Sequence, residues 1–331
     1  MAIFFGAPVL ALLVLDFHFH EKFNNYSMGY NIRGYRGPLL GPKPKGGHRV
    51  VVLGGSTAAG YGVGVDQTMP AFLGRALKTN FTNSAVDVAN LGWNVQGVYS
   101  FPFTIESYAD LKPDLWIFYI GYTDAGINTF DWRKDSLCFR LTGYMPIWPL
   151  IFREKAMALL SGGNLDQMYR DPKIVFTPAL SSKIVGTALH GTVNAVEGME
   201  KILERWAQQK PSPNKGGRTV EPQDALSFYL HWVDQSIQRA LSISDGSVLL
   251  LGQPRIGDWH ASQQKALHEF FLRHYADHSR VFYLDMALAI DLKDRNLAPD
   301  GMHLSSQGNE ILAKKVSPVV GQILGLSSPG F

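Results

Sequence analysis

Short apolar runs alternate with amphipathic segments along most of this chain. The apolar runs are rich in β-branched and aromatic residues and have the length of buried strands, at residues 49–53, 85–89, 114–120, 247–251 and 280–284. Apolar residues recur with a helical period between and after these runs, at residues 69–77, 98–108, 222–243, 262–278 and 304–324. Strands that alternate with helices predict an α/β fold of three layers, in which helices cover both faces of a central parallel sheet.

The alternation stops at residues 125–220, which follow the third predicted strand. This segment is rich in aromatic residues and Met, and its residues 210–217 (KPSPNKGG) predict a turn or loop. We expect a helical insertion, or cap, near the carboxyl edge of the sheet. The sequence leaves open whether it shapes a substrate pocket or only packs. Residues 21–48 are rich in Gly and Pro and predict an extended lead-in to the main domain, residues 49–327.

Residues 1–20 form a hydrophobic N-terminal segment. Its apolar run, residues 2–15, is shorter than the roughly 20 residues that a membrane-spanning helix needs. No Lys or Arg precedes the run and no small-residue cleavage site follows it, which is not typical of a signal peptide. Three interpretations stay open: part of a membrane anchor, an interfacial helix, or a helix packed on the domain. We favour the anchor, which predicts an extracytoplasmic or membrane-anchored protein; the alternative is a cytoplasmic one.

Composition excludes several classes of protein. The 331 residues are 46% hydrophobic and 18% charged, as in a globular domain. The net charge is only +3 and the basic residues are scattered, so we expect no nucleic-acid partner. A single cysteine, Cys138, rules out an internal disulfide, and no zinc-type spacing of Cys and His is present. We expect neither a metal nor an organic cofactor.

The first predicted strand leads into a turn of small residues, GGSTAAG at 54–60, and then into a helix. This order places Ser56 at the carboxyl edge of the sheet, where open α/β sheets bind ligands. A nearby helix N-terminus would favour an oxyanion. The turn is not a phosphate-binding Walker loop, because Tyr61 rather than Lys follows it. It is not a G-x-S-x-G elbow either, because Ala58 replaces the second Gly.

A carboxylate and an imidazole lie three residues apart near the C-terminus, at Asp300 and His303. Both can belong to one loop, so the carboxylate can orient the imidazole. A serine nucleophile needs an adjacent base, and that base needs a third group that fixes its tautomer. The chain supplies all three as Ser56, His303 and Asp300, with Asp285 as a lesser rival for the orienting role.

With these residues the chain resembles the SGNH, or GDSL-type, hydrolases. The resemblance is carried by four blocks, which are VLGGS at 52–56, NLG at 90–92, GYTD at 121–124 and DGMH at 300–303. It extends from about residue 30 to residue 325, apart from the insertion. It implies a flavodoxin-like three-layer fold, into which the pattern of the sequence places the helical insertion after the third strand.

The family resemblance also implies roles for these residues. Ser56 would be the nucleophile, His303 the general base and Asp300 the residue that orients it. The oxyanion would be held by the backbone N–H groups of Ser56 and Gly92, and by Thr123 at the position where the family carries an Asn amide.

Thr123 departs from the family pattern. Its hydroxyl can donate one hydrogen bond and reaches less far than an amide. Loss of one oxyanion donor costs about 2.7–4 kcal/mol of transition-state stabilisation. We therefore expect a slower enzyme, the use of Thr123 itself, or another donor such as Asn94. Asn94 and Tyr122 are also expected to contact the substrate.

The function expected from the resemblance is that of a serine esterase, or acylhydrolase, acting through an acyl-serine intermediate. The partner would be a small-molecule or glycan ester, with deacetylation of a glycan as one form of the reaction. Two alternatives stay open: acyl transfer to a sugar hydroxyl, and a non-catalytic glycan-binding protein on a disabled hydrolase fold.

Overall fold

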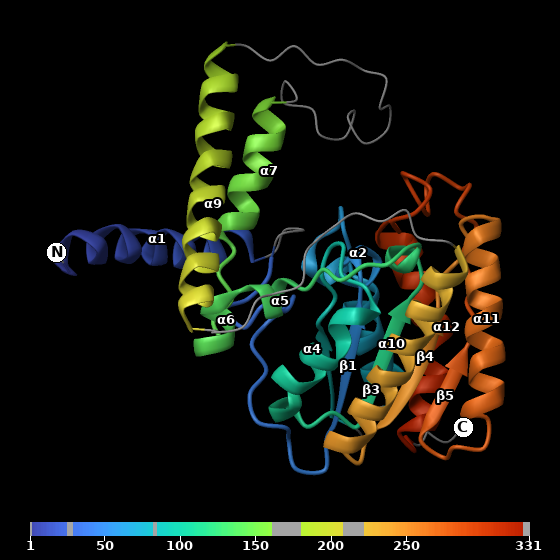
Figure 1. Ribbon diagram of the computed structural model, residues 1–331. Helices are drawn as coiled ribbons and strands as arrows, with labels where there is room; N and C mark the ends of the chain where they lie inside the picture. The colour runs from blue at the N-terminus through green and yellow to red at the C-terminus, as the bar shows by residue number, and fades with distance from the viewer. Residues whose placement is uncertain (1, 25–28, 82–84, 161–179, 208–221, 327–331) are drawn as a thin grey trace. The chain divides into compact units, whose positions relative to one another are not determined.

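The computed structural model describes residues 2–24, 29–81, 85–160, 180–207 and 222–326. The chain forms two compact units (Figure 1). The α/β unit consists of Phe23–Ser136 and Thr219–Phe331, and the helical unit consists of Met1–Lys22 and Leu137–Arg218. The N-terminal segment thus belongs to the same unit as most of the insertion, and residues 125–136 of the expected insertion belong to the α/β unit.

The α/β unit is built on one parallel sheet of five strands, in the order β2-β1-β3-β4-β5. The strands are β1 His48–Gly54, β2 Val86–Asn90, β3 Leu115–Ile120, β4 Ser247–Gly252 and β5 Val281–Leu284. This order is that of flavodoxin-like doubly wound sheets. The predicted α/β fold with a central parallel sheet is therefore confirmed, and the insertion follows the third strand as expected.

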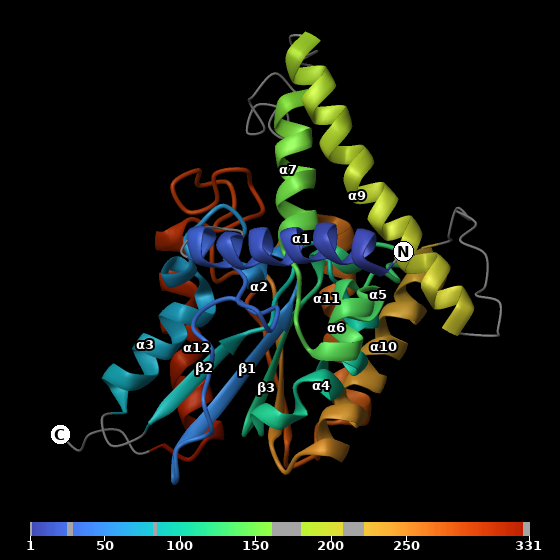
Figure 2. The same ribbon diagram turned by 90° about the vertical axis from the view of Figure 1, so that its left-hand side faces the viewer.

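Helices cover both faces of the sheet (Figures 1 and 2). The described helices of the α/β unit are α2 Ser56–Ala59, α3 Met69–Asn80, α4 Phe101–Ser107, α5 Trp132–Asp135, α10 Pro222–Ile243, α11 Asp258–His274 and α12 Ser306–Ile323. Short 3-10 turns lie at Val65–Gln67, Val98–Ser100, Ala109–Leu111 and Tyr122–Asp124. Helices α3 and α12 pack together on one face, and α4 and α10 pack together on the other. Alternate residues of each strand therefore enter two different cores.

The helices begin where local chemistry favours it. The Ser305 hydroxyl accepts a hydrogen bond from the backbone N–H of Gly308 and caps α12. Leu312, Val316 and Val320 follow at helical spacing and are fully buried. The helix predicted at 262–278 begins earlier, at Asp258, because Gly257 adopts a φ of +148° and turns the chain there.

The helical unit contains α1 Ala2–Phe23, α6 Leu137–Thr142, α7 Trp148–Leu160 and α9 Leu180–Ala207, with α7 and α9 packed along each other. Asp16 of α1 is buried and accepts hydrogen bonds from the backbone N–H groups of Ile147 and Trp148, at 2.8 and 2.6 Å. These groups open α7, so the carboxylate of one helix caps the next. The His20 Nε2 atom lies 3.3 Å from the Asp16 Oδ2 atom. The N-terminal segment therefore packs on the insertion.

The same helix also has an exposed apolar side. Leu10, Val14 and Phe17 each expose more than half of their surface, at 63%, 64% and 54%. In the described part of the chain, no helix is both long enough and apolar enough to cross a membrane.

Candidate active site

Ser56 is the first residue of α2 and follows the end of β1 through Gly54 and Gly55. The chain has no room for side chains at these glycines. A Cβ on Gly54 would lie 2.5 Å from the carbonyl oxygen of Tyr119, and one on Gly55 would lie 2.7 Å from the Thr123 methyl carbon. The two glycines therefore let the strand turn sharply into a helix and leave the Ser56 side chain at the carboxyl edge of the sheet.

Ser56 meets His303 and Asp300 at this edge, although 247 positions separate the serine from the histidine. The His303 Nε2 atom lies 2.8 Å from the Ser56 Oγ atom. The His303 Nδ1 atom lies 2.6 Å from the Asp300 Oδ2 atom. The second Asp300 oxygen accepts the backbone N–H groups of Met302 and His303, at 2.9 and 2.7 Å. The loop thus folds back on its own carboxylate, and Gly301, at a φ of +82°, makes this turn possible.

These contacts determine the charge of Asp300. Partial burial acts to raise the pKa of this carboxyl, but the hydrogen bonds from the His303 ring and from the backbone N–H groups of His303 and Met302 outweigh it. The pKa of Asp300 therefore lies well below its usual range. The ionised carboxylate accepts a hydrogen bond from the Nδ1–H group of His303, which leaves Nε2 as an acceptor for the Ser56 hydroxyl.

Sequence reasoning missed Tyr61, whose ring lies beside the imidazole. The ring centroids of Tyr61 and His303 are 4.8 Å apart, at an interplanar angle of 47°. The backbone N–H of Tyr61 donates to the Ser56 carbonyl oxygen at 2.9 Å, so the turn after α2 brings the tyrosine back over the site. In the sequence, Tyr61 is distinguished only by its position five residues after Ser56. That position does not indicate that its ring would lie beside His303.

Gly92, an expected oxyanion donor, lies against α2, the helix that begins at Ser56. A Cβ at this position would lie 2.4 Å from the backbone nitrogen of Ala59. The backbone N–H of Gly92, however, donates to the Asn90 side-chain oxygen at 3.0 Å. The Gly92 N–H therefore already has an acceptor in this structure.

Thr123 also has a partner. Its methyl group lies over Gly55, and its hydroxyl donates to the carbonyl oxygen of Gln96 at 2.9 Å. Because a threonine hydroxyl carries one hydrogen, this contact uses its donor capacity.

Tyr122 is held by the end of β4. Its backbone N–H donates to the Gln253 side-chain oxygen at 2.6 Å, and its hydroxyl donates to the carbonyl oxygen of Pro254. Burial raises the pKa of this hydroxyl. Gln253 also donates to the Thr57 hydroxyl at 2.5 Å. The contacts of Tyr122 therefore tie the third block to the nucleophile turn, and its role toward substrate stays a prediction.

Asn94 and Val95 complete the loop after β2. Asn94 is half-buried, and Val95 is 61% exposed with a φ of +65°. Among the residues that the structure describes, no acceptor is seen for the backbone N–H of either residue or for the Asn94 side chain. These two N–H groups are donors of this loop that remain available.

Asp285, the rival considered from the sequence, and two further histidines lie apart from these contacts. Asp285 accepts the backbone N–H of Ala287 at 2.8 Å and stabilises its own turn. His260 is buried, which lowers its pKa to about 4 and keeps its ring neutral. His190 is exposed on α9 of the helical unit. Within the described ranges, no group of three or more His, Cys, Asp or Glu side chains is placed to hold a metal ion.

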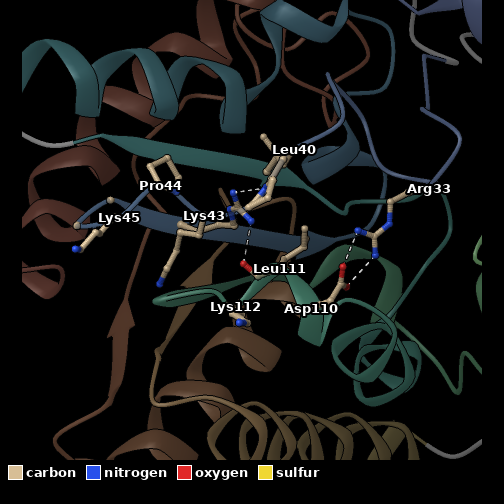
Figure 3. A pocket seen from close by; sticks show the side chains of 13 residues that line it. Arg33, Leu40, Lys43, Pro44, Lys45, Asp110, Leu111 and Lys112 are labelled. Atoms are coloured by element: carbon tan, nitrogen blue, oxygen red, sulfur yellow. Dashed lines mark hydrogen bonds and ion pairs between the residues drawn. The ribbon is translucent and has the colours of Figure 1, made fainter.

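A pocket of about 650 Å³ lies at the opposite, amino edge of the sheet (Figure 3). Its charged lining residues are Arg33, Lys43, Lys45, Arg49, Asp110 and Lys112. Arg33 pairs with Asp110 through hydrogen bonds of 2.8 and 2.9 Å, and Lys43 pairs with Asp114 at 2.8 Å. None of the described lining residues carries a hydroxyl, thiol or imidazole. The pocket lining therefore contains no pair comparable to Ser56 and His303.

No family model matches the sequence, and no curated protein matches it. Solved structures are similar to it, among them a lipolytic protein of the G-D-S-L family from Desulfitobacterium hafniense. That protein is 16% identical, with 82% of this chain and 98% of that chain covered and a TM-score of 0.41. A family 3 carbohydrate esterase from Clostridium thermocellum is 11% identical (85% and 100% covered, TM-score 0.46). An acetylxylan esterase from Geobacillus stearothermophilus is 13% identical (86% and 98% covered, TM-score 0.44).

At such scores and identities the likeness concerns the general fold. The chemistry of this protein has to be argued from its own site.

Proposed function

We propose that the protein is a serine esterase that cleaves a carboxylic ester through an acyl-serine intermediate. The observation that carries this proposal is the unbroken chain of hydrogen bonds from Ser56 Oγ through the His303 ring to Asp300, at 2.8 and 2.6 Å. This arrangement of nucleophile, base and orienting carboxylate is the one that serine hydrolases of unrelated folds share.

The reaction follows from the direction of these bonds. His303 Nε2 takes the Ser56 proton as the Ser56 Oγ atom attacks the ester carbonyl carbon. The tetrahedral intermediate collapses, and the imidazolium returns its proton to the alcohol that leaves. A water molecule, deprotonated by the same nitrogen, then attacks the carbonyl carbon of the acyl-serine. The second tetrahedral intermediate collapses as its bond to Ser56 Oγ breaks, which releases the carboxylic acid, and the imidazolium returns the proton to the Ser56 oxygen. Asp300 keeps the ring in the required tautomer and stabilises the imidazolium that forms.

The oxyanion needs N–H donors near the attacking oxygen. The backbone N–H of Ser56 is one candidate, at the first residue of α2. For the second donor we propose a backbone N–H of the loop that contains Asn94 and Val95, because those groups have no acceptor among the described residues. Gly92 would serve only if its N–H left Asn90, and Thr123 only if its hydroxyl left Gln96.

The proposal is tested with purified protein and p-nitrophenyl esters of increasing acyl length, together with acetylated sugars. We expect turnover of at least one short acyl ester by the wild-type protein. Release of free acid shows hydrolysis, whereas a new ester on an added sugar would show transfer. A protein that neither turns over nor releases a burst of one p-nitrophenol per chain would contradict the proposal and favour a binding role.

A further inference from the structure

The loop after β2 contains a backbone conformation that valine rarely adopts. Val95 has a φ of +65°, in the left-handed region, where a β-branched side chain is strained. The side chain is 61% exposed, so its own packing does not hold this conformation. Strained residues persist only where surrounding contacts determine them, and they gather at functional sites.

The strained residue is held from outside by Asn128. The Asn128 side-chain nitrogen donates to the Val95 carbonyl oxygen at 2.7 Å and to the Thr123 carbonyl oxygen at 3.3 Å. The Asn128 side-chain oxygen accepts the backbone N–H of Phe130 at 3.0 Å, which accounts for the orientation of the amide. One side chain therefore links the loop after β2 to the segment after β3.

Two neighbours of Asn128 in sequence bind the same loop. The Thr123 hydroxyl donates to the Gln96 carbonyl oxygen at 2.9 Å, and Asp124 accepts the backbone N–H of Val98 at 2.9 Å. A Cβ on Gly97 would lie 2.3 Å from the Asp124 carboxylate and 3.2 Å from the Asn128 nitrogen. Three side chains of one segment, Thr123, Asp124 and Asn128, thus hold the loop at 95–98 by hydrogen bonds. We call this set of contacts the clasp.

The clasped loop lies against the nucleophile turn. A Cβ on Gly55 would be 3.1 Å from the Gln96 carbonyl oxygen, and the backbone N–H of Trp93 donates to the Gly54 carbonyl oxygen at 3.0 Å. A change in the backbone at Val95 would therefore move the loop that packs on Gly54 and Gly55, next to Ser56, together with the N–H groups of that loop. The position of such donors governs the stabilisation of an oxyanion.

We propose that Asn128 is a positioning residue that holds Val95 in the left-handed conformation and so directs the N–H groups of this loop toward the oxyanion. The inference rests on the proposed esterase function. Asn128 acts through the backbone and does not touch the substrate. It explains why Thr123 stands where an amide is expected, since in this chain the third block binds the loop instead of the oxyanion.

The test compares Asn128→Ala with Asn128→Ala/Val95→Gly in ester hydrolysis. We expect Asn128→Ala to lower kcat by about tenfold to a hundredfold, with KM changed by less than about threefold, because small displacements of catalytic groups have effects of this size. Glycine adopts the left-handed region without strain. Val95→Gly should therefore raise kcat severalfold in the Asn128→Ala protein, and should not raise it in the wild-type protein.

The matched control is Asn80→Ala, at the end of α3, where the amide hydrogen-bonds Ser317. It should leave kcat and KM unchanged. An Asn128→Ala protein with wild-type kcat would overturn the inference. So would a loss of kcat that Val95→Gly fails to reverse.

Hydrogen exchange separates this inference from the proposed function, because it needs no activity. The backbone N–H groups of Gln96 and Val98 are hydrogen-bonded, to Trp93 and Asp124. Asn128→Ala should make both exchange faster, and Asn80→Ala should not. If Asn128→Ala speeds the exchange of these two N–H groups but the wild-type protein has no esterase activity, the proposed function is refuted and the clasp is retained. If the exchange is unchanged in Asn128→Ala, the clasp itself is refuted.

Discussion

The two halves of the candidate site are built in different ways. The acid–base half consists of three side chains, Ser56, His303 and Asp300, joined by two short hydrogen bonds. The oxyanion half is made of backbone, and the donors expected there, Gly92 and Thr123, are bound to other parts of the protein. Residue type and spacing predict the first half, whereas the second depends on a loop conformation that distant side chains impose.

The largest effect should come from the nucleophile. Ser56→Ala should lower kcat for p-nitrophenyl acetate by about 10⁴–10⁶-fold, because no other group takes over the covalent step. Ser262→Ala, at an exposed serine of α11, is the control and should leave kcat unchanged. Retention of most activity by Ser56→Ala would place the chemistry elsewhere.

The next effect concerns the orienting carboxylate. Asp300→Asn should lower kcat by about 10⁴-fold, because an amide favours the wrong tautomer of His303. The pKa of Asp300 lies well below its usual range, so its charge, and its contribution to stability, are present above about pH 4 and are lost as the pH falls further. The variant should therefore show a shallower loss of stability in acid, measured by urea unfolding. A kcat within tenfold of wild type would contradict the role.

Thr123→Val sharpens the contrast between the two halves. If Thr123 serves the clasp, its loss should lower kcat by less than about tenfold and the free energy of unfolding by about 1 kcal/mol, the value of one hydrogen bond. An oxyanion donor would instead cost 10²–10³-fold in kcat. Steady-state kinetics and urea unfolding of the same preparation distinguish these outcomes.

The smallest effect on catalysis is expected from Asp124, which should alter stability with pH. Burial raises the pKa of this carboxyl to about 7, although the Val98 N–H acts in the opposite direction. Its contribution to stability is full below about pH 4, where the unfolded chain is also protonated, and is lost as the pH rises to about 7. Relative to Asp124→Asn, the wild-type protein should lose on the order of 3–4 kcal/mol over this range. If the free energy of unfolding, measured with urea at each pH, changed equally with pH in the two proteins, the assignment would be contradicted.

Much of the fold follows from local pattern. The five strands and the helix at Pro222–Ile243 lie where the periodicity predicts them, because burial on one or two faces imposes a period on the sequence. The serine, aspartate and histidine could be recognised because each carries distinctive chemistry and two of them share a loop.

Other features depend on contacts between distant segments. The hydropathy of the N-terminal run does not reveal that Asp16 binds the start of α7. The hydrogen bonds of Gly92 with Asn90 and of Val95 with Asn128 depend on the conformation of the loop backbone. No pattern of residue types specifies that conformation. Tyr61 is ordinary in type and spacing, and only the fold brings it to His303.

The most direct test of the central claim is labelling by a fluorophosphonate, which reacts with serine only where a neighbouring base activates the hydroxyl. We expect one adduct per chain by intact mass, located by peptide mapping at Ser56 and abolished by His303→Ala. An unlabelled wild-type protein, or an adduct on another residue, would contradict it.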